Sequence, residues 1–215
     1  MDCRNLCLMA MTVMFIAAGC RKTDPYEGAL GLQSRRVVLS AETGLTPVMV
    51  YSNTSWTVKL ASKVSWAGLD RLEGENSSGL YFSYAANYNL ARKVALAFEA
   101  GEIRDTVWMI QKGGLLNPFI TLSPSSLTLG AGDGSGAVAV TSNLSVDWKD
   151  VEWKVDYIEG DPGWVTDISL SKTSLEFKLK PNGGETVRKA VITVSHCDAE
   201  DNVVKTMLTI NQNPA

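Results

Sequence analysis

The sequence contains little histidine and cysteine, and this scarcity excludes several kinds of chemistry. His196 is the only histidine among the 215 residues, so no cluster of imidazole ligands is available for a metal ion. Of the four cysteines, only Cys197 lies beyond residue 20. A fold built from the later residues therefore has no internal disulfide and must be stabilised by burial of apolar side chains.

An excess of positive charge is also missing. The formal net charge is −3 and the sequence pI is near 5.3, which argues against nucleic-acid binding because that function needs a basic face. Beyond the first twenty residues, no apolar stretch reaches the about 20 residues of a transmembrane helix. We therefore expect neither a nucleic-acid partner nor a membrane-spanning helix.

Residues 1–19 have the layout of a cleaved signal peptide. Arg4 supplies the positive charge, and the apolar run from Leu6 to Gly19 is too short to span a bilayer. The tetrapeptide Ala17-Ala18-Gly19-Cys20 resembles a bacterial lipobox, which implies cleavage before Cys20 and lipidation of its thiol. The alternative is an ordinary secretory signal that happens to precede a cysteine.

Residues 20–35 mix proline, glycine and charge without periodicity, and we interpret them as a lipidated tether. After them the chain repeats itself in two segments, 36–113 and 119–213. A V-x-V-x-S-N phrase begins at Val48 and again at Val138, and later matches keep their order. These matches pair Trp56 with Trp153, Trp66 with Trp164, Asn87 with Asn182, Arg92 with Arg188, and Gln111 with Gln212.

Both copies have the periodicity of β-strands. Apolar residues alternate with polar ones, as in Leu175, Phe177 and Leu179, and runs rich in glycine separate the strands. Short strands at such spacing, without a long helical period, favour β-sandwiches. We therefore predict an all-β chain with two tandem immunoglobulin-like sandwiches, 36–113 and 119–213. The glycine-rich segment 130–136 is predicted to be a hairpin turn, because it lacks the lysine of a phosphate-binding loop.

The phrase S-N-x-x-W-x-V of the first copy, the second tryptophan at Trp66 or Trp164, the R-K pairs and the closing glutamine resemble the BACON domain, and the second copy departs from the phrase by an insertion around residues 144–151. This resemblance implies an immunoglobulin-like fold of the kind found in lipoproteins and glycan-degrading enzymes of Bacteroidetes. It also implies carbohydrate or mucin binding in some members and a spacer role in others.

The repeat divides the six tryptophans into those with a counterpart in the other copy and those without one. The four repeated ones, Trp56, Trp66, Trp153 and Trp164, are predicted to be core residues. Trp108 and Trp148 have no counterpart in the other copy. Alternation places Trp108 on an outer face, opposite Lys93 if residues 99–102 form the turn, while Trp148 lies in an inserted loop. We therefore take Trp108, Trp148 and Lys93 as candidate ligand contacts, with packing on a partner domain as the alternative for Trp108.

Catalytic patterns are weak. His196, Cys197 and Asp198 are adjacent, but neighbours on a strand or turn point apart, which argues against a nucleophile and its base. The acidic residues between Asp147 and Asp161 could form a glycosidase pair or a calcium site, but interleaved lysines favour a solvated edge. No catalytic residue, metal site or cofactor is expected.

These observations predict a non-catalytic lipoprotein of the cell envelope. Its partner would be a glycan or an envelope protein, and its contact with the membrane would be the lipid on Cys20, with the outer membrane favoured. The alternative is a purely structural or adhesive spacer that makes protein contacts.

Overall fold

The structure, a computed structural model, describes residues 28–132 and 134–215. Regular structure in these residues consists of strands and one short 3-10 helix, and no described helix is long and apolar enough to cross a membrane. The prediction of an all-β chain is confirmed. The first group of strands is β1 (Leu30–Leu32), β2 (Arg36–Leu39), β3 (Gly44–Ser52), β4 (Ser55–Leu60), β5 (Ala67–Leu69), β6 (Glu73–Glu75), β7 (Ser78–Tyr84), β8 (Arg92–Ala100) and β9 (Ile103–Gln111). The second group is β10 (Ile120–Ser123), β11 (Ser126–Leu129), β12 (Gly134–Ser142), η1 (Trp148–Asp150), β13 (Glu152–Glu159), β14 (Val165–Leu170), β15 (Ser174–Leu179), β16 (Arg188–Cys197) and β17 (Val203–Gln212).

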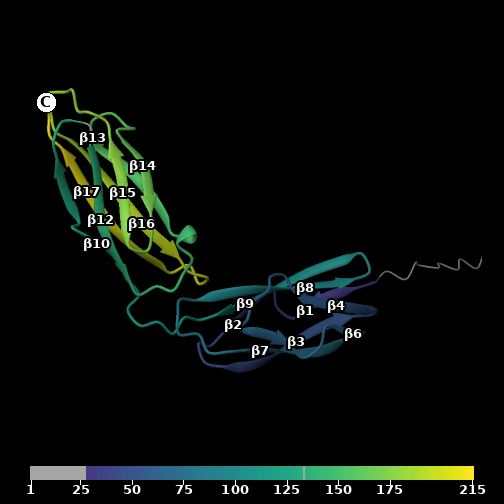
Figure 1. The fold of residues 1–215 in the computed structure, drawn as a ribbon. Coiled ribbons are helices and arrows are strands. Elements are labelled where there is room, and N and C mark those ends of the chain that lie inside the picture. The colour runs from purple at the N-terminus through teal and green to yellow at the C-terminus, as the bar shows by residue number, and fades with distance from the viewer. Residues whose placement is uncertain (1–27, 133) are drawn as a thin grey trace, which may run out of the picture.

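Each group forms two facing sheets. The first sandwich has the strand orders β1-β3-β7-β5 and β2-β9-β8-β4-β6, and the second has β10-β12-β15-β14 and β11-β17-β16-β13. In both, an early strand crosses to the opposite sheet and pairs in parallel with the last strand, as β2 does with β9 and β11 with β17. This is the arrangement of immunoglobulin-like sandwiches. Figure 1 shows the two sandwiches end to end.

The first sandwich begins earlier than the sequence indicates. Residues 30–32, interpreted above as tether, form β1 and pair antiparallel with β3. The strand was missed because its three residues, Leu-Gly-Leu, are too few to show an alternation. Cys20 and the rest of the proposed signal and tether, up to residue 27, lie outside the described residues.

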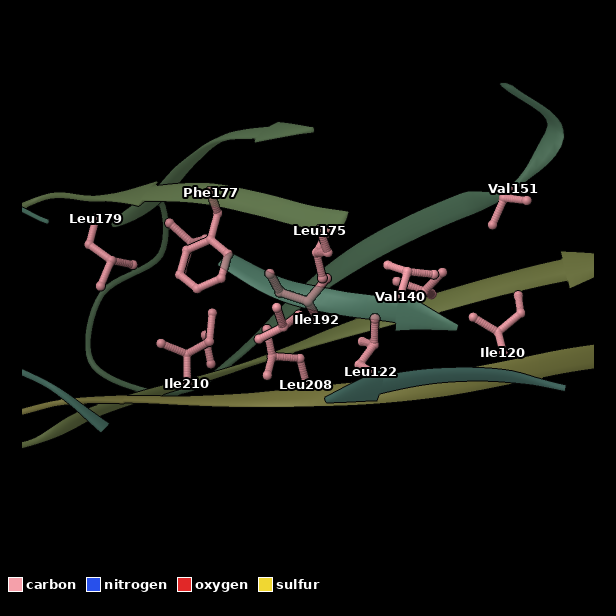
Figure 2. Close-up of a cluster of buried hydrophobic side chains, with 14 of the residues drawn as sticks. Ile120, Leu122, Val140, Val151, Leu175, Phe177, Leu179, Ile192, Leu208 and Ile210 are labelled. Carbon is pink, nitrogen blue, oxygen red and sulfur yellow. The ribbon is translucent and has the colours of Figure 1, made fainter. Parts of the chain in front are cut away.

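Each sandwich buries its own apolar core. Strand alternation predicts the inward residues of β8 and β9 correctly: Val94, Leu96 and Phe98 are buried, as are Val107 and Met109. In the second sandwich, Phe177, Leu175 and Leu179 point from β15 toward Ile192, Leu208 and Ile210 on β16 and β17 (Figure 2). These side chains are at most 4% exposed, so burial of apolar surface is the main stabilising contribution to both folds.

The glycine-rich segment 130–136 is not wholly a turn. Its last residues, Gly134–Gly136, open β12 and pair with β15. A side chain at Gly136 would collide with the ring of Phe177. Glycine is used there because an aromatic ring lies directly over the backbone, and the prediction of a turn is wrong for these residues.

The junction between the sandwiches is packed. Gly114 and Leu115 donate their N–H groups to the carbonyls of Asn87 and Asn89, at 3.0 and 3.2 Å. Leu90, from the loop between β7 and β8, is buried in the core cluster of the second sandwich. Ala199, from the second sandwich, donates its N–H to the carbonyl of Ala91 at 3.3 Å. The loop between β7 and β8 thus contacts both the segment after β9 and the second sandwich.

Candidate functional site

The residues that the two copies share form a polar network in the first sandwich. The Nε of Arg92 donates to the Gln111 side-chain oxygen at 2.9 Å, and its guanidinium lies 4.3 Å from the centre of the Trp66 ring. The Gln111 amide in turn donates to the carbonyl of Ala85 at 2.9 Å, and Asn87 donates to the carbonyl of Lys112. Gln111 and Asn87 are buried, and burial lowers the pKa of the Arg92 guanidinium from its ordinary value.

The second sandwich contains the same network. Arg188 Nε donates to Gln212 at 2.8 Å, and its guanidinium lies 4.6 Å from the Trp164 ring. Arg188 and Gln212 both donate to the carbonyl of Lys180, as Arg92 and Gln111 do to that of Ala85. The shared polar residues satisfy buried backbone groups, so they serve the fold and leave few atoms for a ligand.

Two of the four tryptophans predicted to be core are almost fully buried. Trp56 is 1% exposed and donates its indole N–H to the carbonyl of Asn76 at 3.0 Å, while Trp164 is 2% exposed. Trp66 is half-buried and packs on the first core beneath Arg92. The prediction is confirmed for Trp56 and Trp164.

The prediction is wrong for Trp153, which is 44% exposed. The Arg–Gln pairs set the true equivalence, because Arg92 is opposite Gln111 as Arg188 is opposite Gln212. The residue six positions after Arg92 is Phe98, which pairs with Val58. The residue six positions after Arg188 is Val194, which pairs with Trp153. Trp153 therefore corresponds to Val58.

The place of Trp56 accordingly falls at Val151, two residues before Trp153, which is buried in the second core. In the first sandwich β6 pairs with β4, so Gly74 faces the Trp56 indole. In the second, β13 is the edge strand of its sheet, and the large Trp153 ring has no such cover among the described strands.

Trp148 is not the exposed loop-tip aromatic that the sequence predicts. It begins η1, whose N-cap Asp147 accepts from the Lys149 N–H at 3.1 Å. Its ring is partly buried against the second core, and its Nε1 is shielded without a hydrogen-bond partner. The short helix turns the side chain inward, which a reading of loop composition could not show. Trp148 offers little surface to a ligand.

Trp108 has the outward position that the sequence predicts. It is 45% exposed on the outer face of the sheet β2-β9-β8-β4-β6. Its cross-strand neighbour is Ala95, with Lys93 diagonal, and not Lys93 directly as expected. The turn contains two residues, Gly101 and Glu102, instead of four, which shifts the pairing by two positions.

The surroundings of Trp108 combine an apolar plane with cations. The Lys93 ammonium lies 5.4 Å from the ring centre, a cation–π distance. Arg36 is the neighbour of Trp108 on β2, and the next outward residue of that strand, Val38, is 48% exposed. We call Trp108, Lys93, Arg36 and Val38 the Trp108 patch. The structure brings Trp108 and Lys93 together, while Trp148 belongs to the other sandwich.

Sequence reasoning missed a second exposed apolar surface, on the outer side of the sheet β1-β3-β7-β5. Leu45, Tyr51 and Tyr81 are 62%, 51% and 49% exposed there. The signal was present in the unbroken apolar run from Val48 to Tyr51, because a strand with one solvated face should alternate.

The groups considered for catalysis do not converge. The His196 ring is within hydrogen-bond distance of the Asp150 carbonyl at 3.1 Å, and the Cys197 thiol donates to the Asp198 carbonyl. Among residues 28–132 and 134–215, no group of three or more His, Cys, Asp or Glu side chains could hold a metal ion. Asp156, one of the acidic residues considered above, is paired with Lys154 at 2.6 Å.

Comparison with known proteins adds a family match in the second sandwich. The family model named BACON, described as "Putative binding domain, N-terminal", matches residues 153–213, which run from β13 to the end of β17. No curated protein matches the chain.

Solved structures resemble the chain only at the level of general architecture. A Bacteroides ovatus GH5 xyloglucanase in complex with a XXXG heptasaccharide is 13% identical with a TM-score of 0.36, over 48% of this chain and 22% of that one. An endo-fucoidan hydrolase from glycoside hydrolase family 107 is 15% identical with a TM-score of 0.33, over 90% and 30%. The titin domains z1z2 in complex with telethonin are 12% identical with a TM-score of 0.32, over 87% and 96%. This chain thus spans less than a third of the length of the two hydrolases. Similarity with TM-scores this low does not indicate the function of the chain.

Proposed function

We propose that the chain is a non-catalytic binding lipoprotein of the cell envelope that contacts a glycan through the Trp108 patch. The Trp108 indole, which is 45% exposed on a sheet face beside the cations Lys93 and Arg36, supports this binding. The description of the matching family as a binding domain supports the general class. The lipid on Cys20 would hold the molecule at a membrane, with the outer membrane favoured.

The chemistry of the patch suits a sugar. The C–H groups of a sugar ring carry a small positive charge and stack on the electron-rich face of an indole. Lys93 and Arg36 donate hydrogen bonds and attract carboxylate or sulfate groups, so they would orient a hydroxylated or acidic sugar over the ring. Ala95 is directly beside Trp108, and its small side chain does not cover the indole ring.

A second candidate function, a spacer that makes protein contacts, is supported by the junction. The contacts of Gly114, Leu115 and Leu90 join the two sandwiches through hydrogen bonds and a buried side chain. A rod of two linked sandwiches would hold a partner at a fixed distance from the membrane.

A glycan screen with the detergent-solubilised full chain tests the first candidate. The proposal expects one or more glycans to bind, and expects Trp108→Ala to weaken that binding by about tenfold or more. Trp153→Ala is the matched control, because Trp153 is equally exposed but lies on the other sandwich. Binding that is lost in Trp153→Ala and kept in Trp108→Ala would contradict the proposed site, and no binding to any glycan would favour the spacer.

A further inference from the structure

The outer side of the sheet β1-β3-β7-β5 is without charge. None of the residues in these four strands is Lys, Arg, Asp or Glu. Leu45, Tyr51 and Tyr81 are about half exposed or more, Pro47 is also exposed, and Met49 lies between Pro47 and Tyr51 on the same side of β3. We call these five side chains the uncharged face.

A charged residue at the margin of this face already has partners. Asp70 follows β5 and accepts a hydrogen bond from the Tyr81 N–H at 2.7 Å. Its other carboxylate oxygen lies 3.8 Å from Arg71 Nε. The uncharged face is therefore an apolar centre with a polar rim.

This composition is that of a protein–protein interface. The cores of such interfaces are enriched in tyrosine and methionine and depleted in lysine, glutamate and aspartate. A contiguous exposed apolar patch with a polar rim on a soluble domain generally marks an interaction site.

The second sandwich shows that the fold does not require this face. The corresponding outward positions of β12 hold small residues, with Ala139 in the place of Met49 and Thr141 in the place of Tyr51. Glu176 and Lys178 point outward from β15, and Lys178 is paired with Asp167 at 3.1 Å. Two sandwiches of the same topology thus carry a solvated face and an apolar one.

We propose that the uncharged face is the contact surface between two copies of this chain. A large side chain and a missing one lie side by side on it, because Tyr51 is opposite Gly31. A two-fold axis beside this pair sets Tyr51 of one copy over Gly31 of the other, as an isologous interface requires.

The charge distribution favours the same occupant. The chain carries a formal net charge of −3, so two copies repel each other wherever charged surfaces meet. The uncharged faces of two copies can meet without that repulsion. Sheets that pack face to face approach to about 10 Å.

Sedimentation of the full chain in density-matched detergent tests the proposal. The wild type should show a monomer–dimer equilibrium that depends on concentration. Tyr51→Lys places two like charges across the interface and should raise the dimer dissociation constant about a hundredfold or more. Thr141→Lys, at the corresponding position of the second sandwich, is the matched control and should leave the equilibrium unchanged.

Two results would overturn the proposal. One is a wild-type chain that stays monomeric at every concentration. The other is a Tyr51→Lys variant with unchanged mass that has lost binding to a sugar or an envelope protein, because the face would then have a different occupant. Trp108→Ala should not alter the dimer, so the result is independent of the glycan proposal. A folded Tyr51→Lys monomer, checked by circular dichroism, distinguishes loss of the interface from loss of the fold.

Discussion

At the scale of single residues, the tryptophans show that chemical identity does not decide role. Trp56 and Trp153 both follow a repeated S-N phrase, yet one is 1% exposed and the other 44%. The difference comes from the register. Trp56 faces Gly74 on a neighbouring strand, whereas Trp153 lies two positions later on an edge strand. Burial depends on what lies opposite a side chain, and a single sequence does not contain that information directly.

Trp56→Ala and Trp153→Ala should therefore differ in stability. Removing Trp56 leaves a cavity in the first core and breaks its hydrogen bond to Asn76, which should lower the free energy of unfolding by about 3–5 kcal/mol. Trp153→Ala should change it by about 1 kcal/mol or less because much of the ring is already in water. Urea unfolding followed by circular dichroism measures both, and equal losses would show that the register described here is incorrect.

At the scale of elements, the alternation of apolar and polar residues correctly predicted long strands that have a neighbouring strand on each side. β8 and β9 lie inside their sheet, and their inward residues are predicted correctly because a buried face imposes a period of two. The segment before β13 was misread, since η1 turns Trp148 onto the core where composition indicated an exposed loop. The same alternation predicts the outward position of Trp108, but the exact pairing with Lys93 depended on the turn length, and Arg36 and Val38 were not predicted. Irregular segments and registers depend on contacts between distant residues, and these are the parts the sequence did not predict.

At the junction between the sandwiches, addition of a single methyl group should lower the stability of the protein. A Cβ added at Gly114 would lie 2.5 Å from the carbonyl oxygen of Asn87, so Gly114→Ala must displace backbone. We expect a loss of about 1–3 kcal/mol and faster amide hydrogen exchange at Leu115. Gly183→Ala is the control, because a Cβ at Gly183 meets no atom within 4 Å. If both variants exchange and unfold alike, the junction is not held as described.

At the scale of the whole molecule, the repeat predicted two sandwiches because each copy carries its own Arg–Gln–Asn network and its own core. The uncharged face was not predicted, because only the fold places Tyr81 of β7 beside the outward side chains of β3 and sets the uncharged strands β1 and β5 at their flanks. The apolar run from Val48 to Tyr51 indicates part of this face, but the absence of charge on the neighbouring strands becomes visible only when the strands are assembled.

Membrane attachment should depend on Cys20. Cys20→Ala removes the thiol that the lipobox-like tetrapeptide presents, and we expect an unprocessed or soluble product. Cys197→Ala, which removes the exposed thiol at the end of β16, should still partition into detergent. Phase separation with Triton X-114 and the apparent mass of the product measure the effect, and a Cys20→Ala protein that still partitions as mature lipoprotein would refute the anchor.

Glycan binding at the Trp108 patch can be followed by NMR of the indole N–H groups. Each of the six tryptophans gives one signal, and single substitutions assign them. Addition of a glycan identified in the screen should shift the Trp108 signal, while the signals of the buried Trp56 and Trp164 stay in place. Shifts at Trp153 or Trp148 with none at Trp108 would contradict the account.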